Sequence, residues 1–467
     1  MTSLAGGRQC CSVGAAMTTA AAWPTLAQHV RRTLGFALPV MVARAGLVIM
    51  VTVDTVMTGR VGAAELAYYG ISFAPQIVML TVGIGLLVGV IVLAAQADGA
   101  GRPEQCGRIW HLGLALGGGL GLVYALALSR GNAILSLLGQ GPEITAGGGR
   151  ALALWGPGMP AILMFVATTS FLEGIGRPRP GMVVALGANL LNAGLNWVFI
   201  FGHLGAPAMG AAGAVLATTL TRWAMVAALV GYVLTMGDRA RYGVRAPLAG
   251  RFGDLRRLLA LGAPFAAGIG LETSAFAATA TFAGWLGAVP LAGYQVALNA
   301  TALIYMLAIG LSTATAVRVA NAIGRQDRAG LAWAGWVGTG VAIVLMLAVA
   351  AGVALGADGI AALYSGDAAV RAVATAALHV VAWIVVVDGA QGVLIGATRG
   401  AADVAVPTAI YALSFWAISV PMGYGLGVVA GYGVPGLMWS LFAGLLAAGL
   451  LLGARFHAVA RRPLRPL

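Results

Sequence analysis

Long apolar runs separated by short polar gaps are the dominant pattern along this chain. Twelve of these runs are long enough, at roughly 20 residues, to cross a bilayer as helices. They cover approximately 34–58, 67–96, 109–129, 146–172, 181–202, 210–236, 258–284, 288–317, 330–357, 373–397, 405–427 and 433–456. The runs are continuously apolar and too long for membrane strands, so the pattern predicts an all-α polytopic membrane protein with twelve transmembrane helices.

Composition and the placement of arginine extend this picture. The chain of 467 residues is 60% apolar and 9% charged, whereas soluble domains carry about 25% charged residues. All 27 basic residues are arginine, and when the gaps are split alternately, twenty-one fall on one side and three or four on the other. This bias predicts that both termini are cytoplasmic, and it explains the net charge of +13 without a nucleic-acid partner.

The longest polar gap, about 237–257, divides the chain into two halves that resemble each other. With a shift of 225 positions, Pro39 falls on Pro264 and Gly85 on Gly310. We therefore expect two pseudo-symmetric six-helix lobes related by an axis along the membrane normal, with a site between them. The predicted parts are a cytoplasmic tail at 1–33, an N-lobe at 34–236, a cytoplasmic linker at 237–257, a C-lobe at 258–456 and a cytoplasmic tail at 457–467.

Three acidic residues, Asp54, Glu272 and Asp388, lie deep inside apolar runs, whereas the other eleven lie in or beside the polar gaps. A carboxylate at membrane depth costs at least about 2.5–3.5 kcal/mol, so it is rarely kept without a use. Buried carboxylates bind protons or cations and can release them again. The pattern therefore indicates a cation-coupled transporter.

Asp54 has two amide side chains as candidate companions. Asn192 and Asn196 are four residues apart, on one face of the fifth run. One carboxylate with amide and hydroxyl oxygens is a ligand set for Na⁺, while the carboxylate alone would serve as a proton carrier. The sequence is consistent with a Na⁺ site and with a proton carrier, and also with a third interpretation in which Asp54 only caps a helix end.

Glu272 and Asp388 lie near the middle of their runs, where capping explains neither. If they face one another, the pair can hold a proton near neutral pH or attract an organic cation; the alternative is two neutral carboxyl groups held by hydrogen bonds. Arg44 and Arg222 also lie within runs and need partners. Arg44 is roughly 15 Å along the helix from Asp54, so we expect it to extend toward the cytoplasmic interface instead.

Enzyme signatures are missing from the sequence. It contains no H-E-x-x-H, G-x-S-x-G or P-loop pattern, and its five histidines form no metal-ligand spacing. We therefore expect no enzymatic activity, no cofactor and no structural metal. The three cysteines, Cys10, Cys11 and Cys106, fall on the arginine-rich side and are expected to be free thiols.

Several short motifs together resemble the MATE (multidrug and toxin extrusion) family, most closely its NorM branch. They are Leu-Pro-Val at 38–40, Val-Asp-Thr-Val-Met-Thr-Gly at 53–59, Leu-Leu-Asn-Ala-Gly-Leu-Asn-Trp at 190–197, Gly-Ala-Pro at 205–207, Gly-Ala-Ala-Gly at 210–213, Gln-Val-Ala-Leu-Asn at 295–299 and Gly-Ala-Thr-Arg-Gly at 396–400. The resemblance implies a V-shaped, two-lobed antiporter of the MATE/MOP type. Such a protein works as a monomer in the bacterial inner membrane and expels cationic, amphipathic drugs in exchange for Na⁺ or H⁺.

The same resemblance implies roles for individual residues. Those matching an N-lobe cation site are Asp54, Asn192 and Asn196, and those matching a C-lobe substrate and coupling site are Glu272, Asp388, Gln295 and Asn299. Relatives tend to carry a tyrosine one turn before the last aspartate, but this chain has Ile384 there. The change favours a proton or drug role for the C-lobe pair and H⁺ as the coupling ion.

Two other functions remain as alternatives. A flippase for lipid-linked precursors, from the same superfamily, should line its cavity with arginine where this chain offers carboxylates. A membrane receptor that does not transport its ligand should carry a cytoplasmic output domain, and no gap in the sequence is long enough for one.

Overall fold

The computed structural model describes residues 26–245 and 252–463, and all regular structure in these two ranges is helical. The first half contains α1 (Leu26–Gly59), α2 (Ala63–Gly99), α3 (Glu104–Leu128), α4 (Gly131–Leu137), α5 (Pro142–Trp155), α6 (Gly158–Gly174), α7 (Arg179–Phe201) and α8 (Gly210–Thr235). The second contains α9 (Phe252–Trp285), α10 (Ala288–Gly324), α11 (Arg328–Tyr364), α12 (Ala368–Gly400), α13 (Ala405–Tyr411), α14 (Val420–Gly423) and α15 (Gly433–Ala460). Two π-helical segments, η1 (Ala412–Ser419) and η2 (Tyr424–Val429), join α13 to α14 and extend α14.

The prediction of twelve membrane spans is confirmed for the part of the chain that the structure describes. Eleven helical spans are long and apolar enough to cross a membrane, and the pair α5 and α6, bent by 40° at Gly156–Pro157, supplies the twelfth. Proline lacks the N–H that would continue the hydrogen-bond ladder, which accounts for a break at this point.

Several helices extend further than the apolar runs predict. The first begins at Leu26 instead of residue 34, α9 begins at Phe252 instead of 258, and α15 ends at Ala460 instead of 456. At these ends the helical backbone continues on polar residues beyond the apolar segment. Hydropathy alone does not detect such an extension. Residues 1–25, 246–251 and 464–467, which include Cys10, Cys11 and parts of the predicted tails and linker, lie outside the described residues.

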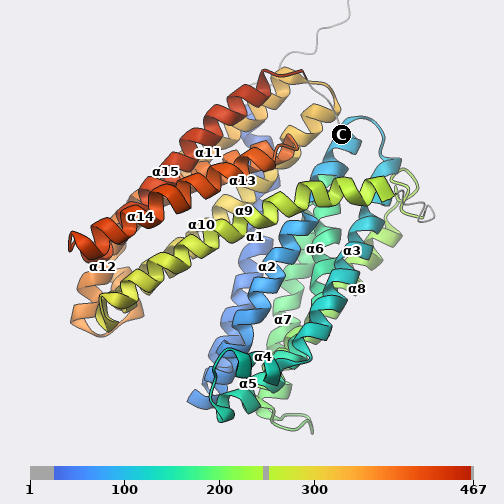
Figure 1. Cartoon of the computed structure of the whole chain (residues 1–467). Coiled ribbons are helices and arrows are strands. Elements are labelled where there is room, and N and C mark those ends of the chain that lie inside the picture. Colours follow the sequence, from blue (N-terminus) through green and yellow to red (C-terminus); the bar gives the residue numbers. More distant parts are fainter. Residues whose placement is uncertain (1–25, 246–251, 464–467) are drawn as a thin grey trace, which may run out of the picture.

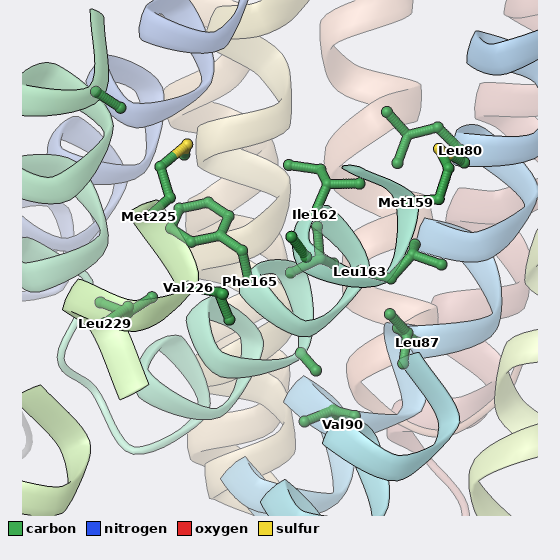
Figure 2. Packing of buried hydrophobic residues seen from close by; sticks show 14 of the residues in the cluster. Leu80, Leu87, Val90, Met159, Ile162, Leu163, Phe165, Met225, Val226 and Leu229 are labelled. Atoms are coloured by element: carbon green, nitrogen blue, oxygen red, sulfur yellow. The ribbon is translucent and has the colours of Figure 1, made fainter. Parts of the chain in front are cut away.

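Each half packs around its own apolar core, so the two lobes form separate bundles. One buried cluster draws its residues from α1 to α8 with Leu258 of α9, and a second draws them from α9 to α15. Figure 2 shows the first cluster, where side chains from α2, α6 and α8, among them Leu87, Phe165 and Met225, fill the space between the helices. In Figure 1 the bundles form a V whose arms separate toward α4 and α5 in one lobe and α14 in the other.

The lobes meet at the arginine-rich end. In the second half of α2 and the first half of α9 the backbones nearly touch, because a Cβ added at Gly262 would lie 2.2 Å from the Leu86 carbonyl oxygen. Nearby, Arg318 of α10 donates a hydrogen bond to Thr33 Oγ1 of α1. Both contacts lie in the halves of their helices that point toward the arginine-rich gaps, so the V is closed at that end and open at the arginine-poor end.

Candidate functional site

The N-lobe site is built around Asp54, which is completely buried on α1. Its carboxyl group accepts three hydrogen bonds, each from a different helix. Asn196 Nδ2 of α7 donates to Oδ1 at 2.6 Å, and Thr218 Oγ1 of α8 donates to Oδ2 at 2.6 Å. The Tyr69 hydroxyl of α2 donates to Oδ2 at 3.3 Å. Since α1 continues to Gly59 and the donors come from other helices, the helix-capping interpretation of Asp54 is wrong.

Asn192 completes this network through hydrogen bonds to two of these donors, Thr218 and Asn196. Its Nδ2 donates to Thr218 Oγ1 at 3.1 Å, and its Oδ1 accepts from Asn196 Nδ2 at 3.1 Å. Asn196 Oδ1 is buried and has no hydrogen-bond partner among the described residues. The structure therefore brings Asp54, Asn192 and Asn196 together as expected and leaves one amide oxygen free to accept a proton donor or a cation.

Two members of the network, Tyr69 and Thr218, were not predicted from the sequence. Threonine in membrane helices usually bonds its own backbone, as Thr221 does to the Ala217 carbonyl at 2.8 Å, so Thr218 carried no distinguishing signal. Tyr69 follows Tyr68, and nothing in the sequence marks which of the two points inward. Only the packing of α2 and α8 on α1 selects these side chains.

Arg222 lies next to this network on α8 and is also buried. Its guanidinium group lies over the Trp155 ring at 4.7 Å from the centroid, and Nη1 is 4.0 Å from Met159 Sδ. It interacts electrostatically with Tyr69 and Asp54 but forms no ion pair with a carboxylate in the described chain. An aromatic ring and a thioether thus take the place of the acidic partner that a buried arginine ordinarily requires.

The C-lobe site places Glu272 of α9 near Asp388 of α12, close enough for the two carboxyl groups to interact electrostatically. Asp388 is buried and Glu272 is partly buried. Tyr305 of α10 and Tyr411 of α13 interact electrostatically with both carboxyl groups. The arrangement agrees with the predicted pair, and it adds two phenols that the sequence did not single out.

Ile384 is 1% exposed and belongs to the apolar core of the C-lobe. The phenol that relatives were expected to place one turn before Asp388 is therefore missing from α12. Instead, the phenols of Tyr305 on α10 and Tyr411 on α13 lie near the carboxyl pair. Gln391 Nε2 donates a hydrogen bond to the Tyr411 hydroxyl at 2.8 Å.

Gln295 and Asn299 were predicted to bind substrate, but among the described residues no hydrogen bond or ion pair joins either of them to the C-lobe carboxylates. Both are exposed on α10, where Asn299 Oδ1 accepts a hydrogen bond from the Tyr364 hydroxyl at 3.0 Å. Asn299 is six residues from Tyr305, roughly 9 Å along the helix toward the arginine-poor end.

A fourth buried carboxylate, Glu173, lies at the edge of its apolar run, near the end of α6. It is 6% exposed on α6, and its Oε1 lies 3.9 Å from Arg44 Nη2 on α1. Arg399 of α12, which lies over the Phe265 ring at 5.1 Å, also interacts electrostatically with Glu173. Arg44 thus has an acidic partner within the protein, at the end of α6 that adjoins an arginine-rich gap.

Comparison with known proteins matches this chain to one family and one fold. The MatE family model matches residues 39–198 and 264–425, one match in each lobe. A probable multidrug resistance protein NorM from Caulobacter vibrioides is 34% identical over 89% of this chain and 88% of its own length. The multidrug resistance protein NorM of Vibrio cholerae is 32% identical over 90% of this chain and 93% of its own.

Solved structures of similar shape support the fold. The Vibrio cholerae MATE transporter VcmN in its bent form superposes with a TM-score of 0.84 at 18% identity, over 93% of this chain and 98% of that one. An outward-facing multidrug resistance MATE family transporter of the MOP superfamily superposes with a TM-score of 0.85 at 19% identity, over 94% and 97%. At these identities the likeness extends to the fold alone.

Proposed function

Because the chain belongs to the MatE family of membrane transporters, we propose that it is a secondary active antiporter that exports cationic, amphipathic drugs or toxins in exchange for H⁺ or Na⁺. Similar relatives are named multidrug resistance protein NorM, which supports this class of substrate. Proteins of this kind move their substrates without changing them chemically, so the chain is a transporter and not an enzyme.

The observation that carries the proposal is the buried carboxyl group of Asp54. All three side chains that donate to it, from Tyr69, Asn196 and Thr218, are neutral. No arginine in the described ranges forms an ion pair with it. A charge held in this way attracts a proton or a small cation strongly, and the hydrogen bonds stabilise the carboxylate once that ion has left.

For the coupling ion, we favour H⁺ with a contribution from Na⁺ at Asp54. A proton needs only the carboxyl group. A Na⁺ ion needs several oxygens, and the unpartnered Oδ1 of Asn196, the Asn192 amide and Asp54 itself offer them. In the C-lobe, Ile384 removes one candidate oxygen from α12, which supports H⁺ there.

Glu272 and Asp388 are proposed to attract the organic cation. Two carboxyl groups in low-dielectric surroundings exert a strong field on a positive charge, and Tyr305 and Tyr411 lie near enough to interact electrostatically with both. Gln295 and Asn299 would contact the substrate nearer the arginine-poor end.

The flippase alternative receives less support from the geometry. A cavity for an anionic pyrophosphate lipid needs arginines that are free to bind it. Arg44 is instead paired with Glu173, and Arg399 shares the same carboxylate electrostatically.

The V shape supports transport by alternating access. The lobes touch near Leu86, Gly262 and Arg318 at the arginine-rich end and separate at the other. If the arginine-rich end and both termini face the cytoplasm of the bacterial inner membrane, this conformation opens outward. Export then requires a second conformation in which the lobes separate at the arginine-rich end.

Purified protein in proteoliposomes tests the proposal by following uphill movement of a fluorescent organic cation. A pH gradient without Na⁺ and a Na⁺ gradient without a pH difference are imposed in separate experiments. We expect the pH gradient alone to drive transport and an added Na⁺ gradient to increase it. If neither gradient drives uphill movement of the substrate, coupled antiport is refuted. If only the Na⁺ gradient drives it, H⁺ is not the coupling ion.

A further inference from the structure

A basic groove opens at the arginine-rich end of the N-lobe, away from both sites described above. It has a volume of about 580 Å³ and lies between α1, the turn before α7, and α8. Its polar lining comes from Arg32 of α1, Arg177 and Arg179 around the start of α7, and Tyr232 of α8, with Phe36 beside them.

Within the part of the chain that the structure describes, two of the three arginines in this groove have no acidic partner. Arg177 forms a two-pronged ion pair with Asp238, in which Nη1 donates to Oδ1 at 3.0 Å. Neither Arg32 nor Arg179 forms an ion pair with any described residue, and both are exposed. The groove therefore keeps about two uncompensated positive charges, and the N-terminal end of the α7 dipole, which starts at Arg179, adds to them.

An apolar stripe runs from this groove along α7. Val183, Leu186 and Leu190 follow Arg179 at helical spacing on the same face, and all three are exposed, Leu190 by 80%. From Arg179 to Leu190 the stripe is roughly 16 Å long, comparable with an acyl chain in one leaflet. The cationic groove matches the head group of a phospholipid, and the apolar stripe on α7 matches its acyl chain. A free phosphate would contact only the groove.

We propose that this groove binds the phosphate-bearing head group of an anionic phospholipid, with one acyl chain lying along the α7 stripe. Arginine guanidinium groups form paired hydrogen bonds with phosphate oxygens, so Arg32 and Arg179 are the head-group ligands. Tyr232 and Phe36 flank the glycerol region. Basic pockets between transmembrane helices on the positive side are suited to such lipids.

The test measures lipid binding to the purified full-length protein by native mass spectrometry, with phosphatidylglycerol and phosphatidylcholine of matched chains. We expect tighter binding of phosphatidylglycerol. Each arginine near an anionic head group contributes roughly fivefold, so R32A or R179A should weaken phosphatidylglycerol binding about fivefold and the double variant roughly 25-fold, while phosphatidylcholine binding stays unchanged. The double variant R32K/R179K keeps the charge but loses the paired hydrogen bonds, so it should recover only part of the loss.

The matched control removes two positive charges from the other lobe, outside the groove. Arg461 and Arg462 are exposed at the end of α15 in the other lobe, and R461A/R462A should bind phosphatidylglycerol as the unchanged protein does. An equal loss in that control would show a general surface-charge effect and overturn the site. Unchanged binding in R32A/R179A would overturn it as well. Full displacement of phosphatidylglycerol by millimolar inorganic phosphate would assign the groove to a free anion instead of a lipid.

Discussion

Alanine in place of Gly262 should shift the two lobes toward a conformation that is open at the arginine-rich end. The new Cβ would lie 2.2 Å from the Leu86 carbonyl oxygen and 2.7 Å from the Leu86 Cα. Both are backbone atoms and cannot rotate away, so α2 and α9 must separate by about 1 Å to restore ordinary contact distances.

This clash destabilises only the conformation in which the lobes touch at the arginine-rich end. Overfilling a close-packed contact costs about 1–3 kcal/mol, which corresponds to a change of about 5–150-fold in an equilibrium between two states. The conformation in which the lobes separate at this end does not bring Gly262 against Leu86 and escapes the cost. The gain in helix propensity from glycine to alanine, up to about 1 kcal/mol, is the same in both conformations and leaves their ratio unchanged.

Distances between spin labels on cysteines placed at Arg102 and Arg461 report this shift, with the native cysteines replaced. Both positions are exposed at the arginine-rich end, one in each lobe. Electron–electron resonance on Gly262→Ala should show a new population at longer distance. The control is Gly270→Ala on the same helix, where an added Cβ meets nothing within 4 Å. A Gly262→Ala distribution identical to that of the unchanged protein, or an equal shift in Gly270→Ala, would refute the reasoning.

Three further predictions concern the two sites. Asp54→Asn should abolish gradient-driven transport while the melting temperature stays near its original value, since the amide keeps the size and much of the hydrogen bonding; uphill transport by this variant would contradict the role of Asp54. Glu272→Gln and Asp388→Asn should each reduce transport of cationic substrates at least tenfold more than that of neutral ones, compared in the same vesicles with the exposed control Asp358→Asn; equal losses for both substrates would indicate a folding defect. Asn192→Ala should reduce any stimulation by Na⁺ more than pH-driven transport, and the reverse order would place the Na⁺ ligands elsewhere.

The architecture was predictable because only a few backbone structures can span a bilayer. Backbone groups in lipid must be satisfied within their own segment, so continuous apolar runs of this length can only be helices. The limits of α1 and α9 were missed by several residues, because a helix that leaves the bilayer continues on polar residues that hydropathy does not score. The broken span of α5 and α6 was foreseen as one run, although its bend at Pro157 was not.

The sites were predictable only in part, for a different reason. Asp54 and Asp388 stand out because a charge is conspicuous in an apolar run. Glu173 did not stand out, since it lies at the edge of its run and one residue before Gly174. Its partner Arg44 is far away in the sequence and could be found only from the packing of α1 on α6.

Asp54 and the contact between the lobes share one helix, and this connects ion binding to conformation. Three hydrogen bonds join Asp54 to α2, α7 and α8, so any change in its charge alters the forces that hold α1 in the N-lobe. Toward its other end, α1 presents Thr33 to Arg318 of the C-lobe. We therefore expect a proton or cation bound at Asp54 to act on the lobe contact through α1, which carries both Thr33 and Asp54. Among the described residues, no comparable hydrogen-bond network joins Glu272 and Asp388 to neighbouring helices. We therefore expect the charge of this pair to act on the substrate more directly than on the position of a helix.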